Sequence, residues 1–180
     1  MTHAPHRDAA FPPETAWEGR YIKVVTQGGW EYVARRGGIQ AAVIVAIDDA
    51  DRVVLVEQYR VPLGRRCLEL PAGLIGDTDA GEAVAVGAAR ELEEETGYRA
   101  GRIEDLGFFH SSPGMNSEGF TLVRAHDLEK VSPGGGEADE DIEVHLVPRA
   151  EIAAFVATKR AEGVAMDVKM LVLLADEMVA

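Results

Sequence analysis

Residues 90–97 read RELEEETG, and this stretch decides the fold. Glu91, Glu94 and Glu95 recur at spacings of three and four residues, so at about 100° per residue they share one face of a helix. Like charges at these spacings disfavour a helix by a few tenths of a kcal/mol per pair (roughly), unless something compensates them. Because hard cations are held by carboxylate oxygens, this face predicts a metal-binding helix.

The helix itself is expected over Glu82 to Thr96. Its apolar positions recur at i, i+3, i+4 and i+7, and they are Ala85, Ala88, Ala89 and Leu92. Gly97 follows directly and is the residue type that most often ends a helix.

Two neighbouring features favour a functional cluster over a solvated acidic face, which is the alternative interpretation. Arg90 lies four residues before Glu94, where its planar guanidinium can orient the carboxylates. The segment Pro71–Gly76, PAGLIG, is expected to be a loop whose backbone approaches the helix closely and lends carbonyl oxygens.

These residues resemble the Nudix box, the loop–helix motif of Nudix hydrolases, in the pattern Gly76-x5-Glu82-x7-Arg90-Glu91-Leu92-x-Glu94-Glu95-x-Gly97-Tyr98. The pattern departs from the family in one respect. In relatives with a Pro-Ala-Gly lead-in, the box glycine is the one in that tripeptide, here Gly73. Gly76 keeps the spacing only if three residues are inserted around 76–79.

The resemblance implies hydrolysis of a pyrophosphate bond with Mg²⁺, for which Mn²⁺ can substitute. The metal would bridge pyrophosphate oxygens and lower the pKa of a bound water for attack on phosphorus. Arg90 and Glu94 are implied in catalysis, and Glu82 as the ion-pair partner that orients Arg90. The implied metal ligands are the Ala72 backbone carbonyl and the side chains of Glu91, Glu94, Glu95 and Glu140.

The resemblance places the general base outside the box, on the loop before a late strand. Glu140 matches that position, whereas in some nucleotide-sugar relatives a glutamate at the position of Glu118 takes the role. The choice stays open because other acids flank Glu140, namely Glu137, Asp139, Asp141 and Glu143. A solvated loop is the alternative for many of these acids.

The flanking segments resemble the ADP-ribose pyrophosphatase branch, and they are Glu57–Arg60, Glu69–Ile75, Ser112–Glu118 and Asp139–Val144. Residues 19–23 and 30–35 resemble segments that sandwich the nucleobase in ADP-sugar hydrolases, with one ring from each subunit of a swapped dimer. The resemblance then implies that the rings of Tyr21 and Trp30 stack on the two faces of the base. Arg35 and Arg60 are implied in holding phosphate or ribose, and Glu118 is implied in binding substrate. A half-buried strand aromatic is the alternative for either ring.

One α/β domain is expected, with the Nudix fold implied: a mixed β-sheet sandwiched between helices, preceded by an N-terminal antiparallel hairpin region. Residues 1–16 are expected to form a flexible tail and 17–180 the domain, with 17–38 serving dimerisation and base binding. The expected strands are 20–25, 30–35, 41–47 (buried on both faces), 53–56 running into 57–60, 106–109, 119–124 and 142–147. Helical patterns close the chain over 152–156 and 168–178.

Composition limits the partners. The 180 residues are 47% hydrophobic and 27% charged, which is typical of a soluble globular domain, and no apolar run is long enough to cross a membrane. A net charge of −13 makes nucleic acid a poor partner. Cys67 is the only cysteine, which suits a reducing cytoplasm, and it is expected to be a packed thiol. The isolated histidines His110, His126 and His145 are interpreted as structural.

Three alternatives to an ADP-sugar hydrolase stay open. Gly134–Gly136 before Asp139–Val144 also resembles the GDP-mannose and other nucleotide-sugar pyrophosphatases. A non-catalytic sensor that binds ADP-ribose is disfavoured by the intact set of box glutamates and arginine. An acidic dimerisation scaffold predicts no dependence on Mg²⁺.

Overall fold

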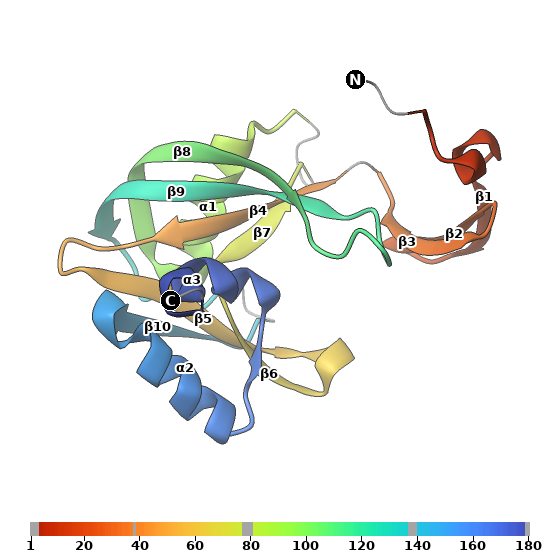
Figure 1. Ribbon diagram of the computed structural model, residues 1–180. Helices are drawn as coiled ribbons and strands as arrows, with labels where there is room; N and C mark the ends of the chain where they lie inside the picture. Colours follow the sequence, from red (N-terminus) through yellow and green to blue (C-terminus); the bar gives the residue numbers. More distant parts are fainter. Residues whose placement is uncertain (1–3, 38, 77–80, 137–139, 179–180) are drawn as a thin grey trace.

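Strands of the described residues form three sheets (Figure 1). The structure is a computed structural model that describes residues 4–37, 39–76, 81–136 and 140–178. The strands are β1 Glu14–Glu18, β2 Ile22–Gln27, β3 Trp30–Arg35, β4 Gln40–Ala46, β5 Arg52–Arg60, β6 Arg65–Glu69, β7 Ala72–Ile75, β8 Tyr98–His110, β9 Gly119–Lys130, β10 Ile142–Pro148 and β11 Ala165–Met166. The helices are η1 Arg7–Ala10, η2 Val61–Leu63, α1 Val84–Thr96, η3 Arg149–Glu151, α2 Ile152–Ala161, η4 Val168–Met170 and α3 Leu171–Met178.

The two larger sheets have four strands each, in the orders β7-β4-β9-β8 and β10-β5-β6-β11. Each contains one parallel pair, β4 with β9 and β6 with β11. The predicted mixture of pairings is therefore confirmed, but it is divided between two sheets. β4 and β5 are consecutive in the chain but belong to different sheets, and their segments are paired through the isolated backbone bridge from Ile47 to Val53.

The strand β4 is buried on both faces, as its continuous apolar sequence predicts. Val43 and Val45 belong to one core cluster, which includes Val156 of α2. Ile44 belongs to a second cluster, which includes Leu92 of α1. Burying one large aliphatic side chain stabilises a fold by about 1.5–3 kcal/mol, so β4 ties both cores together.

The helix α1 ends as predicted and begins two residues later than predicted. Gly97 caps it in the left-handed conformation at φ 70°, and its N–H donates to the carbonyl of Glu93. Glu82 lies before the first turn, because its carboxylate accepts hydrogen bonds from the Gly76 N–H and from the guanidinium of Arg90. The helix therefore starts at Val84.

The segment 71–76 was expected to be a loop, and this prediction is wrong over Ala72–Ile75, which form β7. The strand pairs antiparallel with β4, in the register Gln40↔Ile75 to Val43↔Ala72. The sequence obscured it because small residues and a glycine weaken the strand pattern. The insertion expected around 76–79 falls largely on residues 77–80, which lie outside the described residues.

The strands β8 and β9 are much longer than predicted, and β6 was not predicted. The hairpin of β8 and β9 was expected only over 106–109 and 119–124. Its remaining pairs are mostly exposed and polar, so their sequence carries little strand pattern.

The N-terminal sheet has the order β1-β2-β3. Its first strand begins at Glu14, inside the stretch expected to be a tail, and η1 lies before it. The Gln27 side chain donates to the Phe11 carbonyl (2.8 Å), which ties the segment between η1 and β1 to β2. No helix among the described residues is long and apolar enough to cross a membrane.

Replacing Gly97 by alanine is expected to destabilise the fold by more than the same change at Gly64. Both glycines cap helices at positive φ, where a Cβ costs about 1–2 kcal/mol. A Cβ at Gly97 would also lie 2.1 Å from the Ser132 carbonyl oxygen, whereas one at Gly64 meets nothing within 4 Å. Urea unfolding of both variants measures the difference. Equal losses would show that the helix end does not pack on residue 132.

Candidate functional site

The guanidinium of Arg90 contacts three carboxylates, one just before α1 and two in the C-terminal half of the helix. Its Nε lies 3.2 Å from Glu82 Oε1, and its Nη1 lies 3.0 Å from Glu91 Oε1 and 2.9 Å from Glu94 Oε2. Its Nη2 donates to the carbonyl of Leu74 on β7 (3.3 Å). The ion pairs, led by the hydrogen bond to Glu82, raise the pKa of Arg90. The helix is thereby fastened to the strand that precedes it.

Glu95 is the buried carboxylate of the helix face, with only 4% of the residue exposed. Its Oε2 accepts a hydrogen bond from the Ala72 N–H (3.0 Å). Burial raises the pKa of Glu95 to about 8; the Ala72 hydrogen bond opposes the rise, and the charges of Glu91 and Glu140 add to it. Three carboxylates therefore lie close enough to repel one another, an arrangement that a cation would relieve.

Gly73 lets Glu91 reach this position. A Cβ on Gly73 would lie 1.9 Å from the Glu91 carboxyl carbon, so any larger residue would displace that carboxylate. Gly76 instead adopts φ 81°, and its N–H reaches Glu82. The two glycines that the motif spacing left ambiguous thus have separate structural roles.

Arg60 lies at the end of β5, where its guanidinium forms two hydrogen bonds with the buried carboxylate of Glu69 (2.7 and 2.8 Å). These bonds raise the pKa of Arg60, and the charge of Glu95 adds to the effect. Its side chain remains 42% exposed. Glu69 therefore fixes the Arg60 guanidinium near the carboxylates of α1, and the exposed part of this side chain can contact an anionic ligand.

Glu140 lies just before β10 and close to the C-terminal turn of α1. Gly135 and Gly136 donate to the carbonyls of Glu95 (2.8 Å) and Glu94 (3.0 Å). A Cβ on Gly136 would lie 2.3 Å from Glu140 Oε2, so the glycine leaves room for that side chain. Two of the flanking acids, Glu137 and Asp139, lie outside the described residues.

Glu118 lies on a different segment and pairs with Arg35, whose Nε is 2.5 Å from Glu118 Oε1. The loop before Glu118 is joined to β3, because Val33 donates to the Met115 carbonyl and accepts from the Ser117 N–H. Arg35 and Glu118, both expected to bind substrate, are therefore in direct contact.

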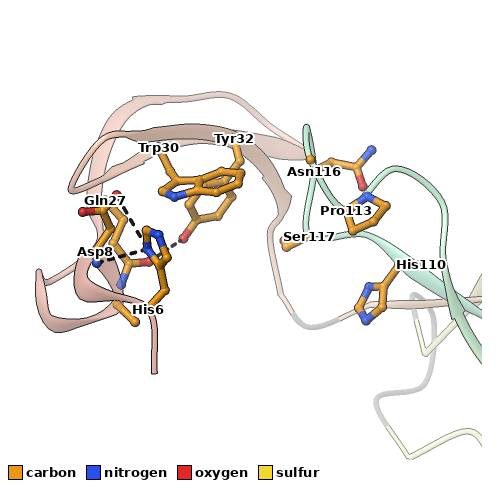
Figure 2. A pocket seen from close by; sticks show the side chains of 11 residues that line it. His6, Asp8, Gln27, Trp30, Tyr32, His110, Pro113, Asn116 and Ser117 are labelled. Atoms are coloured by element: carbon orange, nitrogen blue, oxygen red, sulfur yellow. Dashed lines mark hydrogen bonds and ion pairs between the residues drawn. The ribbon is translucent and has the colours of Figure 1, made fainter. Parts of the chain in front are cut away.

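A pocket of about 430 Å³ lies between the N-terminal sheet and this loop (Figure 2). Trp30 and Tyr32 face it from β3, with His6 and Asp8 of the N-terminal segment beside them, and His110 lies across from them. Its other lining residues are Ala9, Gln27, Pro113, Gly114, Asn116 and Ser117. Apolar rings with a few amides and a carboxylate suit a flat heterocyclic ligand.

Tyr21 does not line this pocket. The residue is 64% exposed, and the guanidinium of Arg20 lies 4.9 Å from the centroid of its ring. Tyr32, which the sequence analysis did not single out, lines the pocket instead. The signal was present, because residues two apart on a strand point to the same face and Trp30 was already chosen. Nothing local in the sequence pointed to His6 or Asp8.

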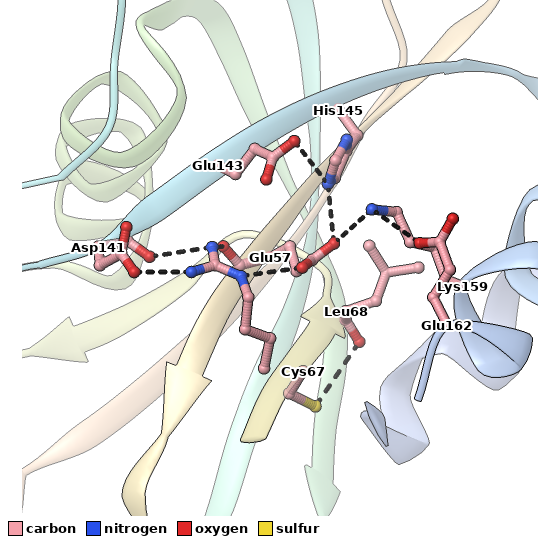
Figure 3. A network of polar contacts seen from close by, with 9 residues as sticks. Glu57, Cys67, Leu68, Asp141, Glu143, His145, Lys159 and Glu162 are labelled. Atoms are coloured by element: carbon pink, nitrogen blue, oxygen red, sulfur yellow. Dashed lines mark hydrogen bonds and ion pairs between the residues drawn. The ribbon is translucent and has the colours of Figure 1, made fainter. Parts of the chain in front are cut away.

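A second polar group lies around Glu57 on β5 (Figure 3). Glu57, Glu143 and His145 present possible metal-ligand atoms within 4.8 Å of one another. Lys159 Nζ lies 2.8 Å from Glu57 Oε2 and Arg66 Nε lies 2.9 Å from Oε1. Burial acts to raise the pKa of Glu57, yet hydrogen bonds from Lys159 and Arg66 lower it overall. Because two cations already neutralise Glu57, this group suits a metal less well than the carboxylates near Glu95 do.

The remaining residues singled out from the sequence have packing roles. Cys67 is buried, as predicted, and burial raises the pKa of its thiol to about 12. His126 pairs with Glu104 on the neighbouring strand (2.7 Å). His110 packs edge-on against Phe108 and also lines the pocket.

Known proteins resemble this chain along most of its length. Residues 38–167 match the family model described as NUDIX domain. Putative nudix hydrolase 2 of Caenorhabditis elegans is 32% identical over 89% of this chain and 81% of its own length. An ADP-ribose pyrophosphatase of Bacillus subtilis is 38% identical over 56% of this chain, and the match spans 52% of that enzyme. A crystal structure of an ADP compounds hydrolase has a TM-score of 0.69 and 27% identity, and the match covers 93% of this chain and 91% of that one.

Without divalent metal, stability is expected to fall as pH rises from about 5 to 8, and Glu95→Gln is expected to reduce that fall. A carboxyl whose folded pKa of about 8 exceeds its ordinary value of 4.5 favours the folded state while protonated, and this advantage is lost as pH rises through that window. Urea unfolding at several pH values measures it. Glu93→Gln is the control, because its hydrogen bond with Arg99 lowers the pKa of Glu93 and keeps its titration below the window. Parallel pH profiles for wild type and Glu95→Gln would contradict the assignment.

Proposed function

Because this chain belongs to the Nudix hydrolase family, we propose that it hydrolyses the pyrophosphate bond of ADP-ribose or a related ADP-sugar in the presence of Mg²⁺. The products would be AMP and a sugar phosphate. The observation that carries the proposal is Glu95, a carboxylate that is 4% exposed, accepts a hydrogen bond from the Ala72 N–H and lies on the same helix face as Glu91. Such a group is costly unless it binds a cation.

The donor set fits a hard divalent metal. Carboxylate oxygens are the preferred ligands of Mg²⁺, and Mn²⁺ accepts the same donors. We assign the metal to Glu91, Glu94, Glu95 and Glu140, with the backbone carbonyl of Ala72. Bound there, the metal would neutralise pyrophosphate charge and lower the pKa of water. Arg90 keeps Glu91 and Glu94 in place through its two ion pairs.

The chain's own residues supply the other requirements of the reaction. Arg60, held by Glu69 and still partly exposed, can pair with a phosphate oxygen through its free edge. Glu140 is proposed as the base that accepts the proton of the attacking water, since it faces the carboxylate group from the β10 side. Glu118 is the second candidate for the base, although its carboxylate is engaged by Arg35.

The pocket beside Trp30 is proposed to receive the nucleobase. Its two aromatic rings lie next to Asn116 and Gln27, whose amides can hydrogen-bond to a base edge. Arg35 and Glu118 are proposed to contact the ribose. Tyr21 lies outside the pocket of its own chain, so its proposed stacking role requires a second copy, and a homodimer is part of the proposal.

Two similarities support an ADP-containing substrate: the Bacillus subtilis relative is named an ADP-ribose pyrophosphatase, and the similar crystal structure is of an ADP compounds hydrolase. A GDP-mannose or other nucleotide-sugar pyrophosphatase is the second candidate, favoured by the glycine run before β10. Cytoplasmic location is proposed from the single, buried cysteine.

Incubation with ADP-ribose and Mg²⁺ is expected to yield AMP and ribose 5-phosphate, and chelator is expected to abolish the reaction. Glu95→Gln should lower kcat at least about a hundredfold with little loss of folding, because it removes a charged metal ligand. Chromatography of the products and a panel with GDP-mannose measure both. Comparable turnover of GDP-mannose would contradict the ADP-sugar assignment, and wild-type activity in Glu95→Gln would contradict the metal site.

Trp30→Ala is expected to raise KM for ADP-ribose about tenfold or more with little change in kcat, because stacking on a base contributes about 1–3 kcal/mol to binding. Phe109→Ala is the matched control, since Phe109 lies on β8, outside residues 17–38, with a similar exposed fraction, and does not line the pocket. Steady-state kinetics give the two constants. An unchanged KM in Trp30→Ala would show that the base binds elsewhere.

A further inference from the structure

Arg66 on β6 joins β5 to the residue that follows Glu140. Its Nε donates to Glu57 Oε1 (2.9 Å) and its Nη2 to the Glu57 carbonyl (2.7 Å). On its other side, Nη1 donates to Asp141 Oδ2 (2.6 Å) and Nη2 to the Asp141 carbonyl (3.3 Å). One planar guanidinium thus holds both the side chain and the backbone of residue 141.

The buried carboxylate of Glu57 holds the Arg66 guanidinium in place. The carboxylate is 4% exposed, and its other oxygen accepts from Lys159 on α2 (2.8 Å) and contacts His145 Nε2 on β10 (3.1 Å). Figure 3 shows Lys159 and His145 meeting Glu57 on the side away from Asp141. A buried carboxylate held by several donors is expensive to move, because each lost partner leaves charge unsatisfied.

The chain before Glu140 has its own attachment. Gly135 and Gly136 are hydrogen-bonded to the last turn of α1, the helix that carries Glu95. The chain after Glu140 is attached at Asp141, and β10 begins at the next residue, paired with Gln58 of β5. Glu140 therefore lies between an attachment on α1 and an attachment on Arg66.

We propose that Arg66 is a positioning residue for Glu140: by holding Asp141 against Glu57, it fixes the direction in which Glu140 points toward the carboxylate group of α1. The inference rests on the proposed function, in which Glu140 accepts the proton of the attacking water. Lysine would not replace Arg66, because an ammonium lacks the planar fork that spans the four acceptors. In this proposal Arg66 acts on the reaction through Asp141 and Glu140 and not through the substrate.

The test compares Arg66→Ala with Arg149→Ala in ADP-ribose hydrolysis. Arg149 is the matched control because it follows β10 and pairs with Asp51 (2.9 Å), the residue before β5, at the opposite ends of these two strands. Arg66→Ala is expected to lower kcat about 10- to 100-fold, since small misplacement of a reacting group costs about this much, while KM changes less than about threefold. Arg149→Ala should keep both constants.

A double-mutant cycle separates positioning from general destabilisation. If Arg66 acts through Glu140, adding Arg66→Ala to Glu140→Gln causes no further loss of kcat, whereas independent effects would multiply. Asp141→Asn, which keeps an acceptor oxygen, should retain much more activity than Asp141→Ala. Multiplicative losses in the double variant would overturn the proposal.

A readout without activity distinguishes failure of this inference from failure of the proposed function. Hydrogen exchange of the backbone over 140–143 is expected to be faster in Arg66→Ala than in wild type and unchanged in Arg149→Ala. Unchanged exchange would refute the attachment itself. Wild-type kcat in Glu140→Gln, together with a loss of kcat in Glu118→Gln, would instead refute the choice of Glu140 as the base.

Discussion

The guanidinium of Arg90 pairs with three carboxylates and one backbone carbonyl, and the arrangement around the box helix depends on these bonds. Glu91 and Glu94 repel each other and Glu95 across one helix face. Arg90 offsets part of that repulsion and, through Leu74, fastens the helix to β7. The strand in turn brings the Ala72 N–H to Glu95, so that a single cation determines where several anions lie.

The carboxylates of the site also need space beside the backbone, and two glycines provide it. Gly73 and Gly136 each leave space that a carboxylate occupies, Glu91 at the first and Glu140 at the second. Because neither position tolerates a Cβ without displacing an acid, the backbone contributes to the site as much as the acids do. The same geometry explains how β7, with its small residues, serves as a strand: β4 supplies its hydrogen-bond partners.

Much of the fold could be predicted, but with uneven accuracy along the chain. β3 was predicted residue for residue and β4 to within one residue, because their apolar patterns are strong and local. β7 and the outer parts of β8 and β9 were not, because small residues and exposed polar pairs form strands only when a partner strand is present. The same reason hid β1, whose exposed residues pair with β2. β6 was also missed, because its buried residues 67–69 include a glutamate and show no alternation of apolar and polar positions.

The sequence by itself determined the acidic helix face, its arginine and its glycine stop, because spacings of three and four residues fix a helix face without reference to the rest of the chain. Only the tertiary structure decided which of those acids is buried, since the burial of Glu95 depends on β7 lying against α1. It also decided that Arg35 meets Glu118, that Arg66 holds Asp141, and that Tyr32 rather than Tyr21 lines the pocket with His6. These contacts join residues up to 83 positions apart, and such pairs are set by the path of the chain and not by any local pattern.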